Sequence, residues 1–151
     1  MIENSPQTDV RPVSGPQRVG GFELIAELGR GGTGIVYRGF DLTLSRTVAL
    51  KRPHAALLEQ PGFSARFLRE ARSASRLLHP NITMVFSTFE DDGVPWIAME
   101  LVEGVSLRAR LAGNRPLAIP EILAHAEGLA DALRLPTSSV FSTSTSAPTT
   151  S

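Results

Sequence analysis

The sequence predicts an α+β fold in which a five-stranded antiparallel sheet carries one helix and two further helices follow. Two observations predict it. Short runs of alternating or β-branched residues recur between turn residues, and the hairpin signal Asp91-Asp92-Gly93 joins the last two runs. Between them lies a run with apolar residues at helical spacing and arginines on its other faces. A chain of 151 residues is long enough for one domain with a sizeable core.

The expected elements follow one another with short connections. The strand-like runs are 22–28, 35–40, 47–52, 82–90 and 95–102. The expected helices are 64–78, 106–111 and a last helix that starts near Pro120 and ends near Leu133. Residues 1–20 are rich in proline and glycine and poor in large apolar side chains, so we expect a disordered leader there.

Composition excludes several classes of function. Lys+Arg and Asp+Glu both number 15, so the chain has no net charge and no electrostatic footprint for nucleic acid. It has no cysteine, which excludes disulfides and thiolate metal sites. No apolar run approaches the roughly 20 residues of a membrane span, and the first residues do not form a signal peptide. A cytoplasmic location is the expectation.

A glycine-rich turn and a later lysine are the features that point to chemistry. Gly29, Gly31 and Gly34 lie between two strand-like runs, and the third run ends in Val-Ala-Leu-Lys, with Lys51 last. Glycine lets the backbone approach a ligand closely, and exposed N–H groups in such a turn suit phosphate oxygens. A lysine from a neighbouring strand adds positive charge. The pattern favours a nucleotide-phosphate site over an ordinary glycine-rich hairpin.

Context separates three kinds of nucleotide-binding turn. A dinucleotide fingerprint needs a helix after the third glycine and an acid about 20 residues later. Here strand-forming residues follow Gly34, and the basic residue Lys51 stands in that region. A Walker loop needs Gly-Lys-Ser/Thr, which the sequence lacks. The glycine loop that continues through x-Val, followed by Val-Ala-x-Lys, is the protein-kinase set.

Glu70 has two interpretations. It lies three residues after Phe67 and four before Ala74, so it borders the apolar stripe of the expected helix. It could be a solvated glutamate that pairs with Arg66. It could instead form an ion pair with Lys51 that holds the lysine on the phosphates, and the context of Lys51 favours this second interpretation.

Four segments together resemble one family. They read LGRGGTGIVYRG, VALK, FLREARSASRLLHPNI and IAMELVEGVSL, in that order. Residues 22–135 therefore resemble the N-terminal lobe and hinge of a bacterial-type serine/threonine protein kinase. The resemblance implies a kinase-like N-terminal lobe and hinge over 21–104, with one αC-type helix, and the first helices of an incomplete C-terminal lobe over 105–135.

The resemblance also implies roles by position. The glycines would cover the ATP phosphates, and Lys51 would hold the α- and β-phosphates and pair with Glu70. Met99, by spacing alone a core methionine, would stand at the back of the adenine pocket. Leu28, Val36 and Ala49 would enclose the adenine, and the backbone of Glu100 and Val102 would bond its edge. The full implied ATP-binding set is Leu28, Gly29, Arg30, Gly31, Gly32, Thr33, Gly34, Ile35, Val36, Ala49, Lys51, Met99, Glu100 and Val102.

Phosphoryl transfer needs further groups. A kinase uses a catalytic-loop Asp, a metal-binding Asn and an Asp-Phe-Gly that holds Mg²⁺. None of these motifs occurs in the sequence, so Mg²⁺ is expected for the intact family but finds no ligands here. We therefore expect ATP binding by a catalytically incomplete kinase fragment, with a protein substrate that the sequence does not identify. The alternative is a non-catalytic, pseudokinase-like module for nucleotide binding or protein interaction.

The last residues change character. Residues 136–151 are rich in Ser and Thr and carry no charge, which predicts a disordered tail. A sharper hypothesis is that this tail is translated out of frame. With freely chosen third bases, codons for these residues read in a shifted frame give His-x-Asp with Asn five residues later, which is similar to a kinase catalytic loop.

The last helix is expected to be poorly covered. Its apolar stripe includes Ile122, Leu123, Leu129 and Leu133, and in an intact kinase such a helix lies inside the C-terminal lobe. Each such side chain left exposed forgoes roughly 1.5–3 kcal/mol. A domain has only about 5–15 kcal/mol of stability, so we expect a marginal chain that tends to aggregate.

Overall fold

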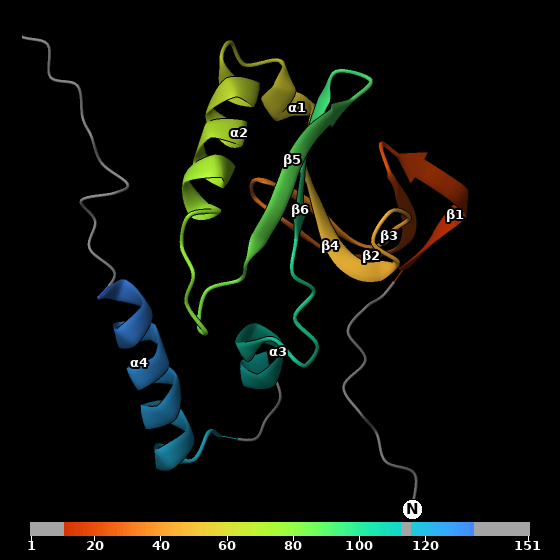
Figure 1. The fold of residues 1–151 in the computed structure, drawn as a ribbon. Helices are drawn as coiled ribbons and strands as arrows, with labels where there is room; N and C mark the ends of the chain where they lie inside the picture. Colours follow the sequence, from red (N-terminus) through yellow and green to blue (C-terminus); the bar gives the residue numbers. More distant parts are fainter. Residues whose placement is uncertain (1–10, 113–115, 135–151) are drawn as a thin grey trace, which may run out of the picture.

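The structure is a computed structural model that describes residues 11–112 and 116–134. The predictions made for residues 1–10 and for the tail 136–151 lie outside the described residues. Within the described residues, an antiparallel sheet forms one body with a helix against one side, and two helices lie beyond one end of the sheet (Figure 1).

The sheet has six strands in the order β1-β2-β3-β4-β6-β5, and each neighbouring pair is antiparallel. Their bounds are β1 Arg11–Val19, β2 Phe22–Gly31, β3 Gly34–Asp41, β4 Arg46–Pro53, β5 Val85–Asp91 and β6 Val94–Met99. Five of these correspond to the strand-like runs predicted from the sequence. The predicted α+β architecture with an antiparallel sheet is therefore confirmed.

Strand β1 corrects two predictions: the disordered leader does not extend over 11–19, and the sheet has six strands rather than five. The proline content suggested disorder, but β1 is an edge strand, where proline removes no hydrogen bond that the sheet needs. Val13 and Val19 pack against the core. The turn to β2 uses Gly20, whose φ of +55° favours glycine and whose N–H donates to Asp91 Oδ1 at 2.9 Å.

The helices also differ in part from the prediction. Their bounds are α1 Ala55–Leu58, α2 Phe63–Ala74, α3 Leu107–Ala112 and α4 Ile119–Leu133. The short α1 was not predicted. Helix α2 ends four residues before the predicted end at 78, so Leu78, the last residue of the predicted helix, lies outside it and is 72% exposed.

Two hydrophobic clusters cover the two faces of the sheet. The larger cluster contains Leu24, Ile35, Tyr37, Val48, Leu50, Trp96 and Ala98. The smaller one joins α2 to the sheet through Phe67, Ala71 and Ile97. Alternation along β6 produces the division, because successive side chains of a strand point to opposite faces. Trp96 and Ala98 therefore face the larger cluster, and Ile97 faces α2.

Helix α4 stands apart from the sheet (Figure 1). No residue of this helix is buried, and Ile122 and Leu129 are 48% and 64% exposed. It contacts the segment before β5, where His79 Nε2 lies 3.2 Å from Asp131 Oδ2. The apolar stripe is therefore uncovered, as expected. None of the helices in the described ranges is long and apolar enough to cross a membrane.

Candidate functional site

The glycine-rich turn is the tip of the β2–β3 hairpin. Gly31 pairs with Gly34, and Gly32 and Thr33 form the turn between them. A Cβ at Gly34 would collide with the carbonyl oxygen of Arg52 on β4, so the start of β3 lies against β4 as only glycine permits. A Cβ at Gly29, Gly31 or Gly32 would meet nothing within 4 Å. The hairpin is thus tightly packed at Gly34 and open at its tip.

The sheet places the predicted lysine beside the hairpin. Lys51 pairs with Val36 on β3 and with Ile97 on β6, so these three side chains share one face of the sheet. Two residues earlier, Ala49 pairs with Met99, and both lie on that same face. The regular strand pairing therefore gathers Val36, Ala49, Lys51 and Met99, which lie in three different parts of the sequence.

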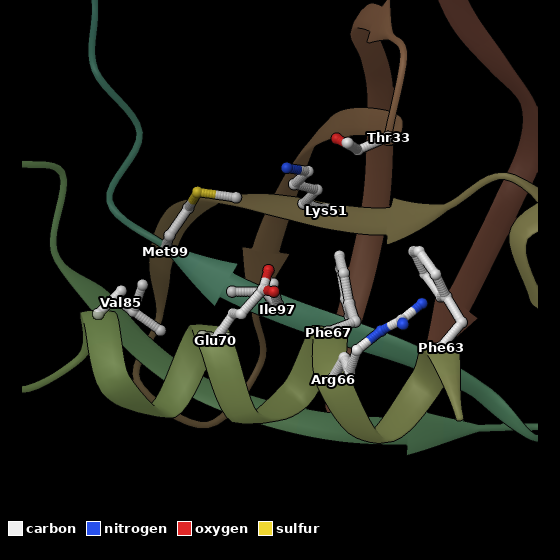
Figure 2. Close-up of a pocket in the computed structure, with 11 residues that line it drawn as sticks. Thr33, Lys51, Phe63, Arg66, Phe67, Glu70, Val85, Ile97 and Met99 are labelled. Atoms are coloured by element: carbon white, nitrogen blue, oxygen red, sulfur yellow. The ribbon is translucent and has the colours of Figure 1, made fainter. Parts of the chain in front are cut away.

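This face forms one wall of a cavity of about 340 Å³. Thr33 of the hairpin tip, Lys51 and Met99 line the cavity from the sheet side, and Glu70 lines it from α2. Figure 2 shows Lys51 extending toward Thr33, while Glu70 reaches up from the helix. The complete lining is Thr33, Lys51, Phe63, Arg66, Phe67, Glu70, Ala71, Ala74, Val85, Ile97 and Met99.

The predicted ion pair between Lys51 and Glu70 is not formed in this structure. Both side chains line the cavity, but the ion pairs among the described residues do not include them, nor a pair between Glu70 and Arg66. Glu70 is exposed and Lys51 half-buried. An exposed ion pair between long side chains is worth about 0–1 kcal/mol, so it does not by itself fix the two rotamers. The structure brings the two groups to one site without joining them.

Arg30, on the glycine turn, is held by its own strand. Its Nε and Nη2 donate to Glu27 Oε1 and Oε2 at 2.6 and 2.8 Å, a bidentate pair. This hydrogen bond lowers the pKa of the Glu27 carboxyl below its ordinary value, and it raises the pKa of the Arg30 guanidinium. The charge of Arg30 is therefore neutralised beside the turn, and the cations that line the cavity are Lys51 from the sheet and Arg66 from α2.

Of the predicted binding residues, Thr33, Lys51 and Met99 line the cavity, whereas Ile35 and Leu28 do not. Ile35 is 3% exposed and belongs to the larger hydrophobic cluster on the other face of the sheet, so its side chain does not face the cavity. Its position follows from strand alternation, because its neighbour Val36 occupies the cavity face. Leu28 is half-buried near the end of β2, where the pairing with β3 shifts register.

The segment after β6 supplies backbone groups. The N–H of Glu100 donates to the carbonyl oxygen of Met84 at 2.9 Å, and its side-chain Oε2 accepts from the N–H of Met84 at 3.2 Å. Because the N–H of Glu100 is already bonded, its carbonyl oxygen is the backbone group left for the predicted bond to an adenine edge. Val102 lies two residues further in an irregular segment and is 68% exposed.

Sequence reasoning missed several residues of the site. Phe63 and Arg66 on α2 line the cavity, and the Arg66 guanidinium lies 5.9 Å from the ring centroid of Phe63. The spacing of Phe63, Phe67 and Glu70 by four and then three residues would have placed all three on one helix face. His54 was also missed. Its Nε2 lies 2.7 Å from the carbonyl oxygen of Gly31, a contact that no local pattern signals.

Comparison with known proteins gives the family to which this fold belongs. Residues 22–135 match the protein kinase domain. Because the match covers more than half of the chain, the chain belongs to the protein kinase family.

No group of three or more His, Asp or Glu side chains placed to hold a metal ion occurs among residues 11–112 and 116–134.

The relatives are bacterial serine/threonine kinases. A probable serine/threonine-protein kinase of Streptomyces coelicolor is 47% identical over 111 residues, covering 70% of this chain and 16% of that protein. The serine/threonine-protein kinase PrkC of Bacillus subtilis is 37% identical over 114 residues, covering 76% of this chain and 18% of that protein. The chain thus spans less than a fifth of the length of these relatives.

Solved structures of kinase domains are similar to this chain as well. A crystal structure of the Mycobacterium tuberculosis PknI kinase domain matches with a TM-score of 0.69 and 32% identity, and the match covers 80% of this chain and 50% of that one. The chain therefore corresponds to about half of a solved kinase domain.

Proposed function

We propose that this chain binds ATP as the nucleotide lobe of a serine/threonine protein kinase. The observation that carries the proposal is that Lys51 and Thr33 of the glycine hairpin line one cavity from the sheet side. The open space beside Gly29, Gly31 and Gly32 fits a ligand that approaches the backbone closely. When bound, ATP would supply the phosphoryl group.

The phosphates would lie between the hairpin and β4. Backbone N–H groups of the turn would donate to phosphate oxygens, as they do in other glycine-rich anion sites. The Lys51 ammonium would supply positive charge from below, and its pairing with Val36 and Ile97 fixes the base of its side chain. Glu70, which lines the same cavity, would orient that ammonium once the lysine contacts phosphate.

The adenine would lie further along the same face. Leu28, Val36 and Ala49 would enclose the ring, and Ala49 is small enough to leave room for it. Met99, the partner of Ala49 in the sheet, would close the back. The carbonyl oxygen of Glu100 and the backbone of Val102 would bond the polar edge of the ring.

We further propose that the 151-residue chain does not transfer the phosphoryl group. The sequence contains neither a His-x-Asp loop nor an Asp-Phe-Gly, which supply the base and the metal ligands in kinases. In the relatives, most of the protein lies beyond the matched segment.

The experiment is an ATP titration of the purified chain by calorimetry, together with an assay for transfer of labelled phosphate to the chain and to a generic protein. The proposal expects saturable ATP binding and no transfer. A chain that serves only as an interaction module gives no binding signal with ATP, and that result overturns the proposal. Phosphate transfer by the purified chain would overturn its second part.

A further inference from the structure

A histidine outside the predicted site contacts the tip of the glycine hairpin. His54 directly follows β4, and its Nε2 lies 2.7 Å from the carbonyl oxygen of Gly31. A carbonyl oxygen only accepts hydrogen bonds, so Nε2 carries a proton and donates it. The two residues are 23 positions apart in the sequence, and the bond joins the hairpin tip to the connection between β4 and α2.

The base of this side chain is fixed. Pro53, on one side of His54, is fully buried, and α1 begins at Ala55 on the other. The carbonyl oxygen of His54 accepts from the N–H of Leu57 at 3.0 Å. Its side chain does not cap α1, although His54 stands at the N-cap position. The imidazole is therefore attached to an ordered backbone segment, and it bonds to Gly31 rather than to the start of α1.

The hairpin tip has few other restraints. Gly31, Gly32 and Thr33 are exposed, and a Cβ on either glycine would meet no atom within 4 Å. The bidentate bond of Arg30 goes to Glu27 on the same strand, so it does not join the tip to the rest of the lobe. Among the described residues, the bond from His54 is the only side-chain hydrogen bond from elsewhere in the lobe to residues 31–33.

We propose that His54 is a positioning residue that holds the glycine turn over the cavity and so pre-organises the phosphate site. Thr33 of the held tip lines the cavity together with Lys51. A turn that is ordered before the ligand arrives loses less conformational entropy on binding, which raises affinity. This inference rests on the proposed ATP site for its effect on affinity, whereas the restraint on the turn is a property of the chain without nucleotide.

The test uses three variants of His54 and two measurements. Gln places its amide nitrogen near the position of Nε2 and can donate, whereas Asn is one methylene shorter and Ala has no donor. Hydrogen exchange of the backbone amides of 32–34, measured without nucleotide, reports the restraint. ATP titration reports the consequence. His125→Ala, on the exposed surface of α4, is the matched control for replacing a histidine.

The proposal expects faster exchange at 32–34 in His54→Ala and His54→Asn, with exchange in β6 unchanged, and wild-type behaviour in His54→Gln and His125→Ala. ATP affinity should fall about 2- to 10-fold in the Ala and Asn variants, the range of one ordinary hydrogen bond. Unchanged exchange in His54→Ala, or a Gln variant that behaves like Ala, overturns the proposal. If the wild-type chain binds no ATP, the proposed function fails, and the exchange measurement alone decides the role of His54.

Discussion

The contact between the start of β3 and β4 gives a sharp test of the hairpin geometry. A Cβ at Gly34 would overlap the carbonyl oxygen of Arg52 and lie 3.1 Å from the Cα of Pro53. These are backbone atoms, so no side-chain rotation relieves the overlap, and the hairpin must separate from the end of β4. Overpacking of this kind costs about 1–3 kcal/mol. Gly34→Ala should therefore destabilise the sheet by that amount.

Urea unfolding followed by tryptophan fluorescence measures the effect. Trp96 is the one tryptophan of the sequence and is 4% exposed in the larger hydrophobic cluster, so its emission reports the sheet. With a urea m value of roughly 2 kcal/mol/M, the midpoint should fall by about 0.5–1.5 M. Gly32→Ala is the matched control, because a Cβ there meets nothing within 4 Å and stability should change by no more than about 0.5 kcal/mol. Equal midpoints for the two variants would refute the reasoning.

Three further predictions concern stability and the reading frame. The hydrogen bond from Arg30 lowers the pKa of Glu27, so the ionised Glu27 stabilises the fold above the ordinary pKa of 4.5, and this stabilisation is lost as pH falls below that value. The difference in unfolding free energy between wild type and Glu27→Gln, measured by urea unfolding, should therefore shrink over this acid range. A difference that grows there would contradict the prediction. Leu50 is fully buried, so Leu50→Ala should lower the free energy of unfolding by about 2–5 kcal/mol. Leu129 is 64% exposed, so Leu129→Ser should leave that free energy nearly unchanged and should reduce aggregation measured by light scattering. Equal losses of stability in the two variants would contradict the exposed position of α4. The gene, sequenced through the codons of 136–151, should encode a kinase-like catalytic loop in a shifted frame, and its absence there would end the frame hypothesis.

The sequence predicted the sheet well wherever alternation and turn residues agreed. The run 47–52 became β4, and the hairpin signal at Asp91-Asp92-Gly93 joins β5 to β6, because both patterns are local and fix the strand face. It failed at β1, where proline composition indicated disorder. Arg11–Val19 pairs with the adjacent strand β2 across the turn at Gly20 and Gly21, so the missed signal was this hairpin turn, which the proline content outweighed.

The sequence predicted which strands, turn and helix supply the residues of the candidate site, but not all contacts between their side chains. Val36, Ala49, Lys51 and Met99 share a face because strand pairing puts them there. The ion pair of Lys51 with Glu70 was predicted but is not formed in the structure, because long side chains at a surface have several rotamers of similar energy and sequence spacing does not select among them. The contact of His54 with Gly31 depends on where a connection passes the hairpin in space, and sequence spacing carries no signal for it.

The central claim is that Lys51 and the glycine turn bind the phosphates of a nucleotide. The most direct measurement compares the affinities of ATP and adenosine for the wild-type chain and for Lys51→Met, with Trp96 emission confirming that both are folded. A charged hydrogen bond is worth about 1.5–3 kcal/mol, so the preference for ATP over adenosine should fall by at least about 10-fold in the variant, while adenosine affinity stays unchanged. A preference for ATP that is the same in both proteins, or absent from the wild type, would contradict the account.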